Sequence, residues 1–440
     1  MREWQASVRN YLRRQTVVWL NNITRIEMKR VVITGMGVIS PIGNNIDAYW
    51  DSLVKGVCGI GAITQYETGD HPVKLAAEVK DFKAEDFGVD KGMARKSDRF
   101  AQFALAAANQ AIEDSGLKSG ENIAADRFGT YIGSGIGGMH VFTTECEKLI
   151  NEGMNRISPL FIPMLIANMA SGQVAIAHHL EGPCIPVVTA CATSTHAVGE
   201  AFHAIKHGYA DAIVAGGSEA AVNPLAIGGF ANSKALSKAT DPNEASLPFD
   251  KRRAGFVMGE GCGILVLEEY EHAKARGAKI YAEVTGYGNT CDAYHYTAPK
   301  PDGVPASKAI KLALEESNFD ASKDLLYINA HGTGTPLNDK GETAAFKLAL
   351  GEEAARKAHI SSSKSMMGHC LGAAGALELI VSALTLKNGI IPPTINLKEA
   401  DPECDLNYTP NVAVKADVNI AFSTSLGFGG HNGCVALRKM

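Results

Sequence analysis

The segment VVITGMG, residues 31–37, sets the fold class of this chain, because a close copy, AEVTGYG, returns at residues 282–288. Both are short apolar runs that end in Thr-Gly-x-Gly, as expected of buried β-strands that stop at a tight turn. Two copies in one sequence indicate an internal duplication. The boundary between the halves is predicted after LVLEEYEHAKARGAK, which separates residues 29–278 from residues 279–440.

A second pair of segments favours the same duplication. PVVTACATS (186–194) and IAFSTSLGFGG (420–430) each run from an apolar stretch into small residues. Strands and helices alternate along the chain, which is typical of α/β proteins. The predicted strands are residues 30–37, 129–133, 185–190, 212–217, 263–268, 281–288, 326–330 and 418–425. The predicted helices, with apolar residues three and four apart, are residues 97–115, 197–207, 304–316, 341–350 and 373–386.

The composition excludes several classes of protein. A net charge of −5 argues against a general nucleic-acid-binding surface, which needs a basic face. No run approaches the ~18 continuous apolar residues of a membrane span, so none is expected. The nine cysteines show no C-x-x-C spacing, which indicates free thiols in a reducing compartment.

Residues 1–28 differ from the rest of the chain, with five arginines against two glutamates. An arginine-rich leader can be a mitochondrial or plastid transit peptide. Since this one is neither rich in serine nor free of acid, we expect a short extension or an upstream start before Met28. The expected location is then cytoplasmic, with a mitochondrion or plastid as the alternative.

The strongest chemical signal is GPCIPVVTACATSTHAVG (182–199), in which an apolar run ends at Ala190 and a helix follows Cys191. A thiol at a helix N-terminus feels the positive end of the helix dipole, which favours the thiolate and predicts a lowered pKa. A free cysteine is usually a small core residue. Cys191 alone has this strand–turn–helix setting, so we interpret it as a nucleophile.

Two further segments supply partners for a nucleophile. YINAHGTGTPLND (327–339) places His331 at the end of an apolar strand, the edge where α/β proteins bind ligands. Thr333 and Thr335 follow it with hydroxyls that can contact a substrate.

SSSKSMMGHCLGAAGALE (361–378) supplies Lys364 and His369 across a turn that opens a helix. A histidine in such a turn is often a surface residue or a cap. Glu378 on the following helix can either face solvent or form an ion pair with Lys364.

Four ordered motifs, T-A-C-A, N-A-H-G-T-x-T-P, K-S-M-x-G-H and G-F-G-G-x-N, resemble the β-ketoacyl-acyl carrier protein synthases of the thiolase-like superfamily. The resemblance runs from about Lys29 to the C-terminus and includes GSGIGG, PFDKRRAGFVMGEG and IPPTINL. It implies an α/β, thiolase-like, duplicated five-layer α-β-α-β-α fold. It also implies decarboxylating condensation of an acyl-carrier-protein thioester with malonyl-acyl carrier protein, and leaves open a fatty acid or a polyketide pathway.

The resemblance also implies a role for each site residue. Cys191 would carry the acyl group, His331 and His369 would serve the malonyl group, and Lys364, held by Glu378, would act electrostatically. The backbone N–H groups of Cys191 and Phe428 would form the oxyanion hole. The substrate contacts would be Thr333 and Thr335 for pantetheine, Phe428 as a gate and Ile136 as the floor of the acyl pocket. No metal is implied, and no cofactor beyond the phosphopantetheine of the acyl carrier protein.

Two partners are expected. The acyl carrier protein is acidic, so docking needs a local basic patch. Lys91, Arg95 and Lys96 in KGMARKSDRF offer one, with Lys91 and Arg95 on one helical face, and Lys234 joins it by resemblance. Family members are homodimers. The strand before Cys191 would pair across the two-fold axis, and the very apolar segment 159–180 would lie at that interface.

The sequence departs from the usual family pattern at two positions. Met367 stands where the family often has Thr, and Leu426 where it often has Phe; His431 receives no catalytic role.

GSGIGG (133–138) fits a dinucleotide fingerprint, but no acid-terminated strand follows it. A thiolase would carry a second cysteine in the GFGG loop, and a cysteine hydrolase has no use for a second histidine.

Overall fold

The computed structural model describes residues 28–440, whose main feature is a sheet with the strand order β4-β5-β6-β1-β7-β13-β12-β8-β9. The leader expected over residues 1–28 lies almost wholly outside this range. The strands are β1 (Val31–Ile39), β4 (Phe128–Gly133), β5 (Ala212–Glu219), β6 (Gly261–Glu269), β7 (Ala282–Cys291), β8 (Leu326–Asn329), β9 (His359–Ser361), β12 (Ile420–Gly427) and β13 (His431–Arg438). Two-residue strands form two further pairs: β2 (Gly61–Ala62) with β3 (Leu75–Ala76), and β10 (Ile390–Ile391) with β11 (Val414–Lys415).

The sheet consists of two equivalent halves that meet at the repeated sequences. In the first half β4 and β5 are parallel, whereas β5–β6 and β6–β1 are antiparallel. In the second half β8 and β12 are parallel, whereas β12–β13 and β13–β7 are antiparallel. The strands that begin with the two sequence copies, β1 and β7, therefore hold equivalent places, and they pair over Val31–Ile33 and Ala282–Val284.

The second predicted repeat pair is wrong. IAFSTS forms β12, whose counterpart in the first half is β5, so it does not match the segment before Cys191. That segment, residues 185–190, is also not a strand in this chain. A single bridge at Cys184 joins it to β4 through two hydrogen bonds, from Thr130 N to Pro183 O (2.9 Å) and from Ile185 N to Thr130 O (3.1 Å). Pro183 and Pro186 lack backbone donors, and no ladder continues beyond this bridge.

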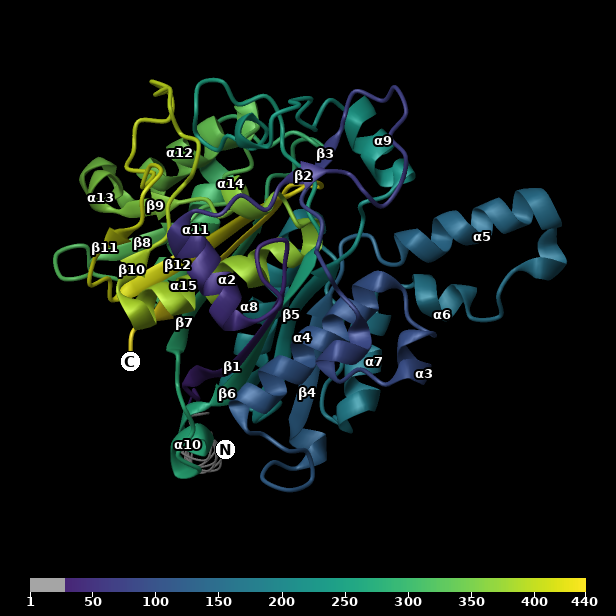
Figure 1. Ribbon diagram of the computed structural model, residues 1–440. Helices are drawn as coiled ribbons and strands as arrows, with labels where there is room; N and C mark the ends of the chain where they lie inside the picture. Colours follow the sequence, from purple (N-terminus) through teal and green to yellow (C-terminus); the bar gives the residue numbers. More distant parts are fainter. Residues whose placement is uncertain (1–27) are drawn as a thin grey trace, which may run out of the picture.

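Helices complete a five-layer α-β-α-β-α arrangement, which Figure 1 shows with α8 and α15 in the middle. Helices α4 and α7 cover the outer face of the first half, and α11 and α12 cover that of the second. Helices α8 and α15 pack against each other between the halves. The bounds of these helices are α4 (Arg99–Ser115), α7 (Met169–His178), α8 (Thr193–Lys206), α11 (Val304–Glu316), α12 (Pro336–Leu350) and α15 (Ala374–Asn388).

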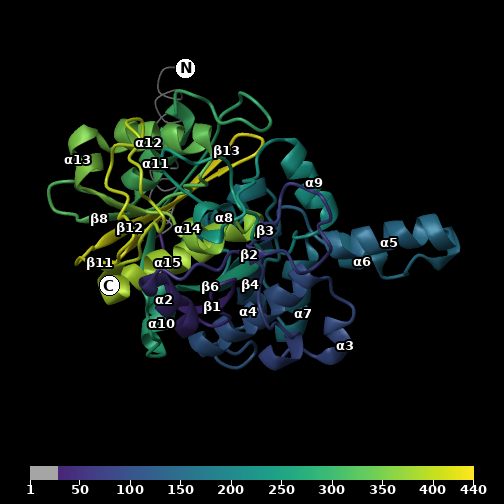
Figure 2. The same cartoon turned by 45° about the horizontal axis from the view of Figure 1, so that its top comes forward.

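Smaller helices decorate this core. Figures 1 and 2 show α5 and α6 projecting from the body as an arm. The bounds are α2 (Ile46–Lys55), α3 (Lys91–Ala94), α5 (Met139–Glu152), α6 (Phe161–Leu165), α9 (Pro224–Asn232), α10 (Tyr270–Ala275), α13 (Glu352–Lys357) and α14 (Lys364–Met367). One helical stretch of the described residues, Leu371–Asn388, is apolar and long enough to span a membrane, but 89% of it is buried inside the fold. It is a core helix.

Candidate active site

A cavity of about 380 Å³ brings together most of the site residues predicted from the sequence. It opens where the ends of β8 and β12 face the start of α8. Its lining includes Cys191, Lys234, His331, Thr333, Thr335, His369 and Phe428. The site therefore combines a cysteine from the first half with two histidines from the second.

Cys191 lies on a tight turn. Ala190 has a positive φ of 52°, and residues Ala190–Ala192 form a single 3-10 turn that leads into α8. The end of β12 approaches this turn closely: a Cβ on Gly427 would lie 2.7 Å from Thr189 O and 3.3 Å from Cys191 N. Glycine at position 427 is thus what allows the next residue, Phe428, to reach the nucleophile.

The prediction of a lowered thiol pKa for Cys191 is wrong. Burial raises the pKa of Cys191 to about 12, and the nearby carboxylate of Glu219 adds to the rise. Lys364 and the backbone N–H groups of Phe428 and of Cys191 itself lower the pKa, but less than burial raises it. Desolvation outweighs the helix end, so the resting nucleophile is a thiol.

The backbone at His331 is held in place by the carboxylate of Glu342, a residue that the sequence did not single out. The backbone N–H of His331 donates to Glu342 Oε1 at 2.7 Å, and that of Gly332 donates to Glu342 Oε2 at 2.8 Å. Thr424 Oγ1 also donates to Glu342, at 2.7 Å. Burial raises the pKa of Glu342 to about 7. The available signal was its place on α12, one helical turn before buried Ala345 and Phe346.

The two imidazoles are buried side by side. The ring centroids of His331 and His369 lie 5.2 Å apart at an interplanar angle of 86°, and Phe256 packs edge-on against His369 at 5.1 Å. Burial, followed by the charge of Lys364, lowers the pKa of both histidines well below the usual value. Both rings are therefore neutral near pH 7.

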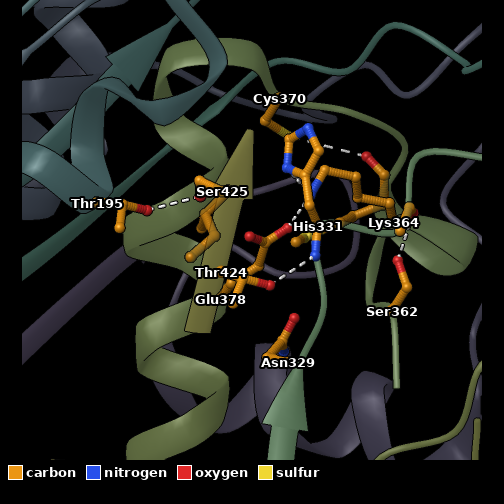
Figure 3. A network of polar contacts seen from close by, with 12 residues as sticks. Thr195, Asn329, His331, Ser362, Lys364, Cys370, Glu378, Thr424 and Ser425 are labelled. Atoms are coloured by element: carbon orange, nitrogen blue, oxygen red, sulfur yellow. Dashed lines mark hydrogen bonds and ion pairs between the residues drawn. The ribbon is translucent and has the colours of Figure 1, made fainter. Parts of the chain in front are cut away.

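Lys364 links His331 to the middle layer of the fold, as Figure 3 shows. Its ammonium forms an ion pair with Glu378 on α15, and both side chains are almost wholly buried. The same ammonium nitrogen lies 3.5 Å from Nδ1 of His331. Burial raises the pKa of Glu378 to about 7, against the opposing effect of Lys364.

Other predicted residues take different places. The hydroxyls of Thr333 and Thr335 lie 2.9 Å apart at the cavity wall, where Leu426 also lies. Met367 instead points into the core, with its sulfur 3.3 Å from the Tyr49 hydroxyl. Ile136 is not among the lining residues of the cavity and is 37% exposed.

The loop that carries Ile136 nevertheless reaches the nucleophile turn. A Cβ on Gly135, the preceding residue, would lie 3.3 Å from Ala190 O. The GSGIGG loop therefore lies close to Cys191, although Ile136 itself is partly exposed in this chain.

The expected basic patch is not continuous on one chain. Lys234 lines the cavity, whereas Lys91, Arg95 and Lys96 lie at α3, which Figures 1 and 2 place well away from α9 and the residues after it. Helix α3 ends at Ala94, and Arg95 caps it with a helical backbone. The Arg95 N–H donates to Lys91 O at 3.2 Å, so Lys91 and Arg95 lie one helical turn apart, as expected.

Among residues 28–440, no group of three or more His, Cys, Asp or Glu side chains is arranged to hold a metal ion. The chemistry available at this cavity is that of a thiol, two neutral imidazoles, backbone N–H donors and one buried ammonium.

Comparisons with known proteins agree with this arrangement. The chain matches the family descriptions "Beta-ketoacyl synthase, N-terminal domain" over residues 28–273 and "Beta-ketoacyl synthase, C-terminal domain" over residues 281–398. It is 50% identical over 411 residues to 3-oxoacyl-[acyl-carrier-protein] synthase 2 of Staphylococcus aureus (strain COL), which covers 93% of this chain and 98% of that protein. The protein of the same name from Synechocystis sp. is 50% identical over 418 residues, covering 95% of this chain and 100% of that protein.

A solved structure gives the same result. A type II polyketide ketosynthase, determined in complex with its acyl-carrier protein, superposes with a TM-score of 0.85 at 35% identity, over 94% of this chain and 100% of that one. With both halves matched and the cysteine and histidines gathered in one cavity, the chain belongs to the β-ketoacyl synthase family.

Proposed function

We propose that this chain elongates fatty acyl chains by two carbons through decarboxylating Claisen condensation of an acyl-carrier-protein thioester with malonyl-acyl carrier protein. The observation that carries the proposal is the sharing of one cavity by the Cys191 thiol and the neutral imidazoles of His331 and His369. The names of the curated relatives support it.

The first half-reaction transfers the acyl group to Cys191. The sulfur attacks the thioester carbonyl, the bond to the pantetheine sulfur breaks, and the thiol proton leaves with that sulfur. The backbone N–H groups of Cys191 and Phe428 converge on Sγ and are placed to donate to the oxyanion of the tetrahedral intermediate. Thr333 and Thr335 are proposed contacts of the pantetheine arm, and Phe428 the gate of the acyl pocket.

The second half-reaction uses the histidines. Because the ammonium of Lys364 can only donate, Nδ1 of His331 accepts, and its proton is then carried on Nε2. Two neutral imidazole donors stabilise the enolate oxygen that forms as the malonyl carboxylate leaves as carbon dioxide. The enolate carbon attacks the acyl carbonyl, the bond between that carbon and Sγ of Cys191 breaks, and the released thiolate takes a proton from solvent. Lys364, tied to Glu378, supplies charge and forms no Schiff base.

The carrier protein is the proposed partner, and the phosphopantetheine that it carries is the only prosthetic group that the scheme needs. Lys234 at the cavity supports a docking site there, and Lys91, Arg95 and Lys96 form a second proposed contact. The relative solved with its acyl-carrier protein supports this class of partner.

We also propose a homodimer. The arm exposes apolar side chains, among them Ile150 (81% exposed) and Met154 (77%). Val188, in the unpaired segment before Cys191, is 55% exposed. A second copy that pairs with this segment would cover both surfaces, and also Ile136, which we propose as the floor of the acyl pocket. Sedimentation of a stable monomer at micromolar concentration would contradict the homodimer.

Three finer points belong to the same proposal. Residues 29–278 and 279–440 form the two halves, in keeping with the end of α10 at Ala275 and the start of β7 at Ala282. The enzyme is cytoplasmic, unless residues 1–28 act as an organellar leader. The alternative activity is a polyketide-type condensation. It is less favoured, because the chain is 35% identical to the polyketide ketosynthase but 50% identical to 3-oxoacyl-[acyl-carrier-protein] synthase 2 of Staphylococcus aureus.

One experiment decides between condensation and hydrolysis. Purified enzyme is first acylated from acyl-carrier protein and then given malonyl-carrier protein. A β-ketoacyl product one two-carbon unit longer supports the proposal, whereas release of the free acid would identify a hydrolase. A series of primer chain lengths in the same assay gives the acyl preference.

A further inference from the structure

The turn that carries Cys191 has a second copy in the fold. In the first half, Ala190 has a φ of +52°, residues 190–192 form a 3-10 turn, and α8 follows. In the second half, Leu371 has a φ of +46°, residues 371–373 form a 3-10 turn, and α15 follows. Gly372 thus holds the place in the second turn that Cys191 holds in the first.

The copied turn is occupied by a carboxylate from the other half. Glu219, the last residue of β5, is fully buried and accepts from the Gly372 N–H at 3.0 Å. Its Oε2 also accepts from the Gly135 N–H at 2.8 Å. Two backbone donors therefore converge on this oxygen, as the N–H groups of Cys191 and Phe428 converge on the nucleophile sulfur.

The remaining contacts tie Glu219 to the loop after β4. Oε1 accepts from Ser134 Oγ at 2.7 Å and from the Ile136 N–H at 3.2 Å. All four donors are neutral, so hydrogen bonds and not a counter-ion oppose the burial that raises the pKa of Glu219. Gly372 is packed so closely against Gly135 and Glu219 that no larger residue fits: a Cβ on Gly372 would lie 2.5 Å from Gly135 N and 2.7 Å from Glu219 Oε2.

We infer that Glu219 is a positioning residue: its carboxylate fills the anion site of the second turn and holds the Ser134–Ile136 loop and the Leu371–Ala373 turn in place around Cys191. The loop abuts the nucleophile turn at Ala190 O, and the turn begins two residues after His369. The inference rests on the proposed function, which gives Cys191 and His369 their catalytic roles. Glu219 itself does not line the catalytic cavity.

The inference predicts two opposite changes when the carboxylate is removed. In Glu219→Ala the loops relax, so transfer of an acyl group to Cys191 should fall by about 10²-fold, the usual cost of a 1 Å misplacement. The same substitution removes a negative charge that raises the pKa of Cys191, so alkylation of Cys191 by iodoacetamide at pH 8 should become faster. Looser packing would also speed alkylation by exposing Cys191 to solvent, so the response to formate separates the loss of the charge from the loss of packing.

Formate tests whether the site is an anion site. Added at millimolar concentrations to Glu219→Ala, formate should restore acylation severalfold and slow alkylation again, whereas chloride at equal ionic strength should not. Glu268→Ala is the matched control: Glu268 is also buried near a strand end, but it is held by Arg276, His272 and Thr34. That variant should show neither the paired change nor the rescue.

Several results would overturn the inference. A folded Glu219→Ala that acylates at the wild-type rate, or whose defect formate does not relieve, contradicts it. If Glu219→Ala does not fold, Glu219→Gln takes its place and should show the same paired change without formate rescue; wild-type rates in that variant would also contradict the inference. Alkylation is read by mass spectrometry of the Cys191 peptide and needs no condensation. A wild-type enzyme that does not condense would therefore refute the proposed function separately.

Discussion

The ammonium nitrogen of Lys364 lies 3.5 Å from Nδ1 of His331, and this contact determines which imidazole nitrogen carries the proton. Lys364 is in turn paired with Glu378 inside the middle helical layer. The tautomer of a histidine that follows β8 is thus set by a residue on α15, through a lysine that lies between them.

Replacing Lys364 with Met should lower malonyl decarboxylation about 10²–10³-fold, the range for removing one electrostatic element from a preorganised site. It should also make stability depend on pH. Without the ammonium, the pKa of Glu378, already raised to about 7 by burial, rises further above its unfolded value. The buried carboxyl is then tolerated when protonated and becomes costly as the pH rises.

Melting temperatures measure this effect. Lys364→Met should lose more thermal stability relative to wild type at pH 8 than at pH 6. Glu378→Gln in the same background should remove the difference, because the amide does not titrate. Equal losses at both pH values would mean that Glu378 is not the titrating group.

A second prediction separates the two half-reactions. Cys191→Gln should abolish condensation but leave or raise malonyl decarboxylation, because the histidines and Lys364 remain in place. His331→Ala should lose both activities. Carbon dioxide release and ketoacyl product are measured side by side, and elongation by Cys191→Gln would show that another residue is the nucleophile.

The pH dependence of alkylation tests the protonation state of Cys191. With a pKa of about 12, its thiolate fraction rises about tenfold for each pH unit between 7 and 10. The rate of iodoacetamide reaction at the Cys191 peptide should follow that slope without a plateau. A plateau near pH 9 would mean that the helix end and Lys364 outweigh burial after all.

Enlarging Ile136 tests the proposed pocket floor. Ile136→Phe should slow acylation by a C12 primer about 5- to 150-fold, because overpacking typically costs about 1–3 kcal/mol. A C6 primer should react almost normally, since it does not reach that depth. A melting curve measured alongside separates a blocked pocket from a loss of stability. Equal loss with both primers would remove the chain-length role.

Charge reversal tests carrier-protein docking. Arg95→Glu combined with Lys96→Glu should raise KM for acyl-carrier protein and weaken the salt dependence of KM, because fewer opposite charges meet. Lys357→Glu, on the exposed helix α13, is the control and should change neither. An unchanged salt profile in the double variant would leave these residues as ordinary surface charges.

The sequence alone was sufficient to predict those parts of the fold whose signal is local. The strands β1 and β7 repeat one motif, so both their positions and their equivalence could be predicted. Segment 185–190 is equally apolar, but a strand also needs regular hydrogen bonds to a neighbouring strand, and of this segment Ile185 alone donates to β4. A local pattern cannot report that absence.

The site shows the same limit. Cys191, His331 and His369 could be found because each follows a strand or opens a helix. Glu342 and Glu219 could not, because their partners are backbone N–H groups that only the fold brings together. The direction of the Cys191 pKa also depends on burial, which the turn sequence does not reveal.

The middle layer of α8 and α15 has a consequence for how the molecule unfolds. Both helices contact strands of both halves, so neither half can open without exposing the apolar faces of this shared layer. The two halves should therefore melt as one cooperative unit. Duplication gave residues 28–440 two similar parts, but the layer between them means that neither part is an independently folding domain.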